Sequence, residues 1–402
     1  MAETNPTNSN DISLSKPEPT QINLFKNQKI LPNKITSKDI VKIIRKNKNI
    51  VIIIISVIIL LIILLNINNI SKLFKKKKKP IEEIVVVDKK PVKKNFKIFF
   101  EENLDELEYC DNYGLMIYDN YYTGVIHKPN IGDYIQSLAA LQFLPKNCKP
   151  YFIDRDIVQF YHGPKVKLIM NSWQVIHEGN KYISDDIIPI FVSYHLNSNF
   201  ELPQVYIDAL KKYSPIGCRD TKTRNQFIKY GIDSYFSSCL TTTLDMEYAV
   251  NDNERNNDII FIDYNYGDYP QADKFLRSLK AYNLSESNIK HTRHKFNNDL
   301  SHIERFKMAK KLLNRYARAK LIVSTRIHGA LPSLALRTPV IFIKNEYDHN
   351  RFPGIYELLN TVGPNEKGKF EVRVNIDEKG LVYNSNKYLE YANKMKERLK
   401  HI

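Results

Sequence analysis

The chain has 402 residues, of which 43% are hydrophobic, and it holds four cysteines. This length leaves room for two domains and excludes a disulfide-held mini-protein. The formal net charge is +16, but residues 1–97 account for +13 and residues 98–402 for only +3. A basic leader before a nearly neutral body favours contact with a membrane and no nucleic-acid partner, because nucleic-acid binding needs basic side chains along a groove.

The leader divides into a tail, an apolar run and a stem. Residues 1–48 are expected to be a disordered basic tail, because they are rich in polar residues that cannot bury enough apolar surface to order the chain. An almost unbroken apolar run from Ile50 to Leu65 has lysines on both sides, which predicts one transmembrane helix over residues 49–68. The run lies too far from the N-terminus for a signal peptide. A basic stem over residues 69–97 follows.

The orientation in the membrane is not decided by the flanking charges, because residues 30–49 and 66–85 hold six Lys or Arg each. A short tail before the span and a large domain after it are typical of a signal anchor. We therefore expect a single-pass membrane protein with its large domain in a lumen of the secretory pathway.

The four cysteines have none of the spacings that are typical of zinc sites, so no metal site is expected. They are Cys110, Cys148, Cys218 and Cys239. Cys218 and Cys239 end two successive strand-like runs and could lie close together. All four are expected to be free thiols.

From residue 98 onward, short apolar runs alternate with helical periodicity in two blocks, 98–245 and 246–362. In the first block we expect strands at 115–118, 150–153, 166–170, 189–193 and 215–218, and helices at 133–144, 203–212 and 220–230. In the second block we expect strands at 259–263, 321–324 and 340–343, and helices at 270–280, 299–318 and 328–336. This alternation predicts an α/β fold of two Rossmann-like domains with parallel sheets that face a cleft. An extension with an amphipathic helix follows over 363–402.

The predicted helix at 299–318 has a basic face opposite its apolar face. Its cations are Lys307, Lys310, Lys311, Arg315 and Arg318, with Lys320 just beyond. Such a face is typical of the solvated side of an amphipathic helix, and we interpret it so.

The most informative segment runs from a buried strand directly into a helix through Thr325-Arg-Ile-His-Gly329. Backbone N–H groups and the positive end of a helix favour an anion there, and Gly329 would let a ligand approach the backbone. Arg326 can grip a carboxylate or phosphate with two hydrogen bonds, and His328 can transfer a proton near neutral pH. The alternative is that Arg326 pairs with a structural carboxylate and His328 caps the helix.

Two more turns carry candidate residues. Arg219 follows a predicted strand and would project into the cleft, while Asp220 or Thr221 caps the next helix. The turn at 130–136 begins the helix after the first strand, and it offers Gly132, Asp133 and Gln136 for ligand contacts. Asp133 is a second candidate catalytic residue beside His328, although it could equally be an N-cap. His195 and His294 are isolated histidines with either a structural or a substrate-binding role.

Taken together, these turns resemble the polysaccharide pyruvyl transferase family. The matching segments are Asn-Ile-Gly-Asp at 130–133, Ile-Gly-Cys-Arg-Asp-Thr at 216–221 followed by 231–232 and 239–244, and Ser-Thr-Arg-Ile-His-Gly at 324–329 before 338–342. The resemblance implies a two-domain fold similar to that of the B-type glycosyltransferases, with phosphoenolpyruvate as donor and a pyruvate ketal formed on a sugar. It does not cover the leader or the predicted span.

The resemblance also implies which residues hold the donor. The turn Arg326-Ile327-His328, with Gly329, would bind it from the second domain, and Arg219 matches an arginine of the first. Arg351 lies in a segment that resembles a form seen in some members, and it is a candidate substrate contact.

The residue types agree with a donor that bears a carboxylate and a phosphate, because two arginines and a helix N-terminus can neutralise about three negative charges. The expected activity is therefore membrane-anchored pyruvyl transfer from phosphoenolpyruvate, as co-substrate, to a glycan or polysaccharide, with no cofactor and no metal. Two alternatives stay open. One is a glycosyltransferase of the same architecture that uses a nucleotide sugar, and the other is a glycan-binding protein without catalysis.

Overall fold

The computed structural model describes residues 108–402, apart from 119–128, 147, 175–181, 197–200, 297–299 and 346–351. All of these residues belong to one compact unit, Lys93–Ile402. The predicted tail, transmembrane helix and most of the stem fall outside it, and residues 1–107 lie outside the described part. Within the described part, no helix is both long enough and apolar enough to cross a membrane.

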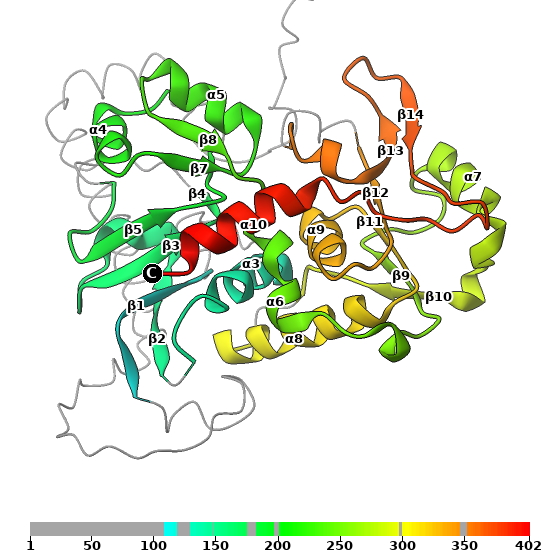
Figure 1. Ribbon diagram of the computed structural model, residues 1–402, viewed down its shortest axis with the longest axis horizontal. Coiled ribbons are helices and arrows are strands. Elements are labelled where there is room, and N and C mark those ends of the chain that lie inside the picture. Colours follow the sequence, from blue (N-terminus) through cyan, green and yellow to red (C-terminus); the bar gives the residue numbers. More distant parts are fainter. Residues whose placement is uncertain are drawn as a thin grey trace, which may run out of the picture. The chain divides into compact units, whose positions relative to one another are not determined.

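The first sheet is parallel and follows the predicted strands closely (Figure 1). In spatial order its strands are β2 (Lys149–Asp154), β1 (Tyr109–Ile117), β3 (Val166–Met170) and β5 (Ile187–Phe191). Two small parallel sheets accompany it: β7 (Ile216–Cys218) with β8 (Ser234–Phe236), and β4 (Trp173–Gln174) with β6 (His195–Leu196). The helices of this region are α3 (Ile131–Leu141), α4 (Gln204–Lys212), α5 (Thr221–Lys229) and α6 (Asp245–Tyr248).

The second sheet has five parallel strands and one antiparallel strand at its edge. In spatial order they are β10 (Ile289–Thr292), β9 (Ile259–Ile262), β11 (Leu321–Ser324), β12 (Val340–Ile343), β13 (Asn360–Pro364) and β14 (Phe370–Arg373). Its helices are α7 (Pro270–Ser278), α8 (His302–Arg318) and α9 (Ile327–Ala335), and α10 (Tyr388–Leu399) follows. The predicted α/β class with parallel sheets is confirmed, and β8 lies in the strand-like run that was expected before Cys239, while β4, β6, β10, β13 and β14 were not predicted.

Short 3-10 helices connect several of these elements. They are η2 (Arg155–Phe160), η3 (Leu240–Thr243), η4 (Asp252–Glu254), η5 (Lys280–Tyr282), η6 (Glu286–Asn288) and η8 (Tyr356–Leu358).

Strands β9, β11 and β12 of the second sheet are almost entirely apolar because both of their faces are covered. Successive side chains of a strand point to opposite faces. Accordingly, Ile259 and Phe261 of β9 pack in one core cluster, together with Leu276 of α7. Ile260 and Ile262 pack in the other, which contains the buried faces of α8 and α9. The alternation places α7 on one face of the sheet and α8 with α9 on the other.

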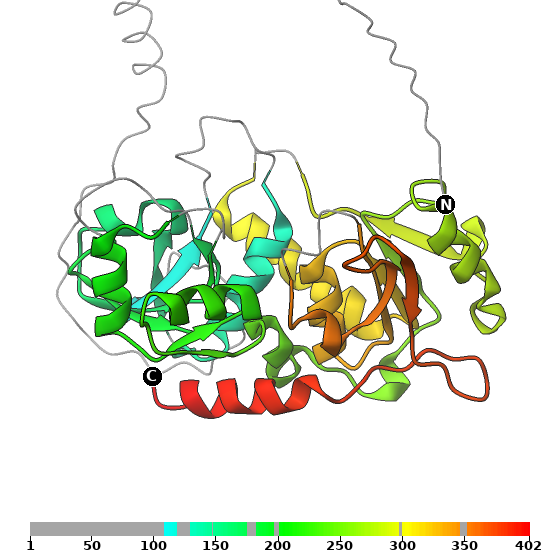
Figure 2. The same cartoon turned by 90° about the horizontal axis from the view of Figure 1, so that it is seen from above.

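Helix α8 and helix α10 link the regions of the two sheets. The side chain of Arg305 on α8 donates to the hydroxyl of Tyr134 on α3 at 2.8 Å and to the carbonyl of Tyr118 after β1 at 3.2 Å. The C-terminal helix α10 runs back from the second sheet to the first (Figure 2), where Lys396 pairs with Asp245. One continuous cluster of buried apolar side chains also contains residues from both regions.

The prediction that all four cysteines are free is wrong for one pair. Cys110 of β1 forms a disulfide with Cys148, which precedes β2. The two strands are neighbours, and Tyr109 pairs with Lys149 in their ladder, so the pairing brings these cysteines opposite each other. The spacing of the cysteines in the sequence could not reveal this disulfide, because its formation depends on which strands lie side by side. Cys218 and Cys239 are free and buried.

Candidate functional site

The order of the strands marks one edge of the second sheet as the place for a ligand. From β9 the chain crosses to β10 on one side and then to β11 on the other. In open α/β sheets, ligands bind at the carboxyl ends of strands where the connection reverses direction in this way. Asp263 follows β9 and Arg326 follows β11, so both residues lie at this point.

Arg326 and Asp263 form an ion pair. The Nε atom of Arg326 donates to Oδ2 of Asp263 at 2.6 Å, and the side chain of Arg326 is 37% exposed. Arg326 thus has a carboxylate partner, as the alternative interpretation expected, and its partial exposure leaves it open to a ligand. Because this bond uses Nε, the N–H groups of the two terminal nitrogens remain as donors for a ligand.

Asp263 joins the carboxyl ends of three strands. Its carboxylate also accepts from the backbone N–H of His294, which follows β10, at 3.2 Å, and its carbonyl accepts from the hydroxyl of Thr325, which follows β11, at 2.9 Å. Its φ of 48° is left-handed, a conformation that a non-glycine residue adopts only where its surroundings stabilise it. Asp263 is the last residue of the strand predicted at 259–263 and was not among the predicted site residues.

A cavity of about 670 Å³ opens at this edge, and its lining carries a net positive charge. It is lined by Asp263, Tyr264, Asn265, His291, Thr292, Arg293, Lys295, Phe296 and Arg326. Three permanent positive charges therefore face one carboxylate. Arg293 and Lys295 were missed because the strand that positions them, β10, was not predicted.

The turn after β11 differs in detail from the sequence expectation. Helix α9 begins at Ile327 with Arg326 as N-cap, so His328 is its second residue and does not cap it. The hydroxyl of Ser324 accepts from the backbone N–H of Arg326 at 3.0 Å. A Cβ atom at Gly329 would lie 2.6 Å from Oγ of Ser324, so this glycine permits close packing of helix on strand where ligand approach was expected.

The start of α3 lies directly against these turns. Asn130 caps the helix by accepting from the backbone N–H of Gly132 at 3.0 Å, so the reading of Asp133 as N-cap is wrong. The backbone N–H of Ile131 donates to the carbonyl of His294 at 2.8 Å. A Cβ atom at Gly132 would lie 3.0 Å from Nδ1 of His294 and 3.0 Å from Cβ of His328. Gly132 therefore allows three turns to meet.

Asp133 lies in the first turn of α3, among charged groups at the carboxyl edge of the first sheet. Loss of water raises the pKa of its carboxyl, while the positive charges of Arg155 and Arg219 lower it. Gln136 donates to Oδ1 of Asp133 at 3.2 Å. Arg219 follows β7 and Arg155 follows β2, and both are buried. The sequence analysis predicted Arg219 and Gln136 here but missed Arg155, which also lies 5.1 Å from the ring of Trp173.

His195 is paired with Asp220. Its Nδ1 lies 2.6 Å from Oδ2 of Asp220, and both side chains are buried. Asp220 caps α5 as expected, since it accepts from the backbone N–H of Thr223 at 2.8 Å. Although burial opposes it, the hydrogen bond with His195 lowers the pKa of Asp220. This pair holds the imidazole at the carboxyl edge of the first sheet.

His294 is buried, and its Nε2 lies 3.0 Å from the hydroxyl of Tyr316 on α8. Burial lowers its pKa to about 4, assisted by the charge of Arg326 and opposed by that of Asp263. The ring is therefore neutral at neutral pH. Arg351, the last of the candidate contacts, lies outside the described residues.

The turns described above all lie in a segment of the chain that matches a known protein family. A family model described as polysaccharide pyruvyl transferase matches residues 130–347, which is more than half of the chain. The chain belongs to this family. A search of curated proteins found no match. A solved structure of an uncharacterized protein from Klebsiella pneumoniae subsp. pneumoniae is similar, with 14% identity over 62% of this chain and 90% of that one and a TM-score of 0.35.

Among the residues that the structure describes, no group of three or more His, Cys, Asp or Glu side chains could hold a metal ion. The candidate site of this pyruvyl transferase family member combines arginines, histidines and Lys295 with the acidic residues Asp133, Asp220 and Asp263.

Proposed function

We propose that the chain transfers the pyruvyl group of phosphoenolpyruvate to a sugar of a polysaccharide and forms a ketal. Membership of the pyruvyl transferase family supports a transferase that acts on polysaccharide. The observation that carries the choice of donor is the cationic cavity at the carboxyl ends of β9, β10 and β11. Arg293, Lys295 and Arg326 line it with Asp263, so its lining suits a small ligand that bears both a carboxylate and a phosphate.

In this proposal the donor lies against Arg326, Ile327 and His328, and Arg219 meets it from the first sheet region. Gly132 supports this arrangement, since its missing side chain brings the turn of α3 against His328. The two regions would close over the donor as the two Rossmann-like domains of B-type glycosyltransferases do. Phosphoenolpyruvate is a co-substrate, and the proposal involves no cofactor.

The reaction needs one acid and one base. An acid protonates the methylene carbon of the enolpyruvate, and C2 becomes cation-like. One sugar hydroxyl adds to C2 and gives its proton to the base. The C2–O bond then breaks, and phosphate leaves with the bonding electron pair. A second hydroxyl adds to C2 and gives its proton to the departing phosphate, which closes the ketal. We assign the acid to His328 and the acceptance of a hydroxyl proton to Asp133, because burial raises the pKa of its carboxyl and so makes the carboxylate a stronger base. Gln136, His195, His294 and Arg351 are then candidates for contacts to the acceptor sugar.

We also propose that the protein is anchored in a membrane by residues 49–68, with its large domain in a secretory-pathway lumen. The apolar run and its flanking lysines support the anchor. The disulfide between Cys110 and Cys148 supports the lumen, because disulfides persist in oxidising compartments and are rare in the cytosol.

Ligand binding can be followed by the fluorescence of Trp173, the single tryptophan of the chain, which lies beside Arg155. Phosphoenolpyruvate is expected to change its emission with saturation, whereas a panel of sugar nucleotides is not. Product formation is checked by mass spectrometry of a sugar acceptor, which should gain one pyruvyl ketal.

Replacing Arg326 by Ala is expected to weaken donor binding by about 2 kcal/mol, roughly 30-fold, at the lower end for a charge partner because the side chain is partly exposed. Lys at this position should restore only part of the affinity, since a point charge cannot form two parallel bonds. Arg224→Ala, which changes an arginine on α5, is the matched control. Binding of a nucleotide sugar in place of phosphoenolpyruvate would support a glycosyltransferase. Binding of a glycan without turnover of either donor would support a glycan-binding protein without catalysis.

A further inference from the structure

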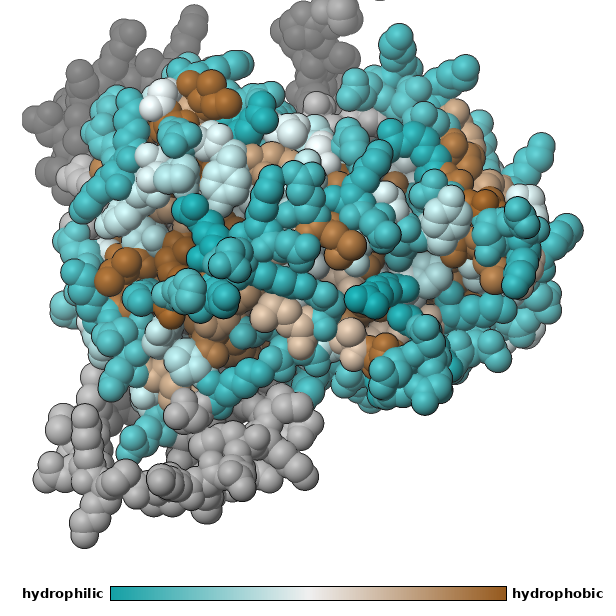
Figure 3. Space-filling view, viewed as in Figure 1, coloured by the Kyte–Doolittle hydropathy of each residue, from teal (hydrophilic) through white to brown (hydrophobic). Residues whose placement is uncertain are grey.

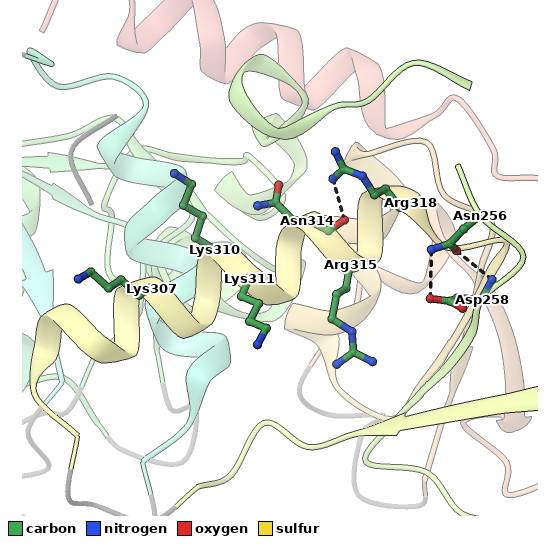
Figure 4. A pocket seen from close by; sticks show the side chains of 8 residues that line it. All are labelled: Asn256, Asp258, Lys307, Lys310, Lys311, Asn314, Arg315 and Arg318. Atoms are coloured by element: carbon green, nitrogen blue, oxygen red, sulfur yellow. Dashed lines mark hydrogen bonds between the residues drawn. The ribbon is translucent and has the colours of Figure 1, made fainter. Parts of the chain in front are cut away.

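The solvent face of α8 carries five cations along about three turns, on the side opposite its buried face. They are Lys307, Lys310, Lys311, Arg315 and Arg318. These residues line a groove of about 370 Å³, which we name the α8 groove (Figure 4). The groove lies apart from the cavity at the carboxyl edge of the second sheet, because the two share no lining residue.

Most of this positive charge is not neutralised by neighbouring carboxylates. Within the described part of the chain, Lys307, Lys311 and Arg315 have no acidic partner at ion-pair distance, and Arg318 pairs with Glu254 at 3.2 Å. Figure 4 shows Lys311 and Arg315 projecting to the same side of the helix. These residues are four apart, which places them about 6 Å from each other along the helix axis. The groove therefore offers a short row of cations to a ligand with repeated negative charges.

The remaining lining residues favour a glycan as that ligand. Asn256 and Asn314 add amide donors and acceptors that can bind hydroxyl groups, and Asp258 can accept from them. A bilayer surface would be met by apolar or aromatic side chains beside the cations, and single-stranded nucleic acid by aromatic rings on which bases stack. The groove has neither kind of side chain in its lining. The face in Figure 3 is likewise mostly hydrophilic, with apolar areas only as separate patches.

We propose that the α8 groove is a second, non-catalytic binding site for a carboxylate-bearing polysaccharide. This inference rests on the proposed function for the source of its ligand: each pyruvyl ketal adds one carboxylate to the acceptor chain, so the product is a polyanion. The groove retains the modified part of the chain while its next sugar is presented to the site. Helix α8 connects the groove with the candidate site, because its buried face supplies Tyr316, whose hydroxyl lies 3.0 Å from Nε2 of His294.

The test uses the full-length protein in detergent and polygalacturonate, a polysaccharide that carries only carboxylates, with neutral dextran for comparison. Lys311→Glu combined with Arg315→Glu reverses two charges in the groove. Lys367→Glu combined with Lys369→Glu makes the same charge change in the exposed turn between β13 and β14 and serves as the matched control. Affinity for polygalacturonate is expected to fall at least tenfold in the first variant and less than twofold in the second. Dextran should not bind.

Pyruvyl transfer to a short sugar acceptor, which cannot reach the groove, should change less than twofold in both variants. Equal polygalacturonate binding by the groove variant and the wild type would overturn the proposal, as would groove-dependent binding of phosphatidylserine vesicles or nucleic acid in preference to the polysaccharide. If polygalacturonate binding depends on the groove but no pyruvyl transfer is found, the proposed binding site is supported and the proposed reaction is wrong.

Discussion

His294 is expected to make the stability of the fold depend on pH. Burial lowers the pKa of its ring to about 4, whereas an unfolded histidine has a pKa of about 6.5. Between these values the unfolded chain binds a proton that the folded chain does not. The stabilising contribution is therefore fully present above pH 6.5 and is lost as the pH falls toward 4.

The size of the loss follows from the two pKa values. One pKa unit corresponds to about 1.4 kcal/mol, so the complete loss is about 3 kcal/mol. Between pH 7.5 and pH 5, His294 should account for about 2 kcal/mol of the decrease in the free energy of unfolding. His294→Gln keeps a polar side chain near the hydroxyl of Tyr316 but cannot titrate, so this part of the decrease should disappear.

Denaturant unfolding at pH 7.5 and pH 5, followed by the fluorescence of Trp173, measures the effect in each protein. His291→Gln is the matched control, because His291 lies on the same strand β10 and is exposed. The control should lose as much stability on acidification as the wild type. If His294→Gln also loses as much as the wild type, the buried, neutral state assigned to this ring is wrong.

Four further predictions concern other parts of the molecule. Asp263→Asn should weaken phosphoenolpyruvate binding about tenfold while the fold is kept, because Arg326 loses a charged partner. An unchanged affinity in the fluorescence titration would exclude a role of Asp263 in positioning Arg326. Gly132→Ala should lower stability by about 1–3 kcal/mol, since its Cβ would meet two histidines, and an unchanged melting temperature would contradict this contact. Cys110→Ser should cost about 4 kcal/mol in non-reducing unfolding experiments, given the sequence separation of 38 residues, and no cost would mean that the disulfide is absent. Protease added outside intact microsomes should leave residues 98–402 uncut, and their digestion would reverse the proposed orientation.

The sequence by itself determined the class of fold and most of its elements. The runs Ile259–Ile262 and 321–323 are apolar without interruption, and in runs this short the pattern is typical of strands covered on both faces. The amphipathic period of α8 likewise predicted which of its faces is buried. These properties are local, because they depend on the order of side chains along one element. The Arg-x-His-Gly turn could be found for the same reason.

The tertiary structure alone decided which of these turns meet. Asp263 pairs with Arg326 across 63 positions of sequence, and Cys110 bonds to Cys148, because parallel pairing places the ends of neighbouring strands at one edge of a sheet. Asp263 could have been selected by taking every polar residue at the carboxyl end of a predicted strand. Its pairing with Arg326 and its left-handed backbone could not have been predicted, since both depend on the order of the strands in the sheet. The contact of Gly132 with His294 and His328 joins three distant segments, and only the packed fold specifies their separation.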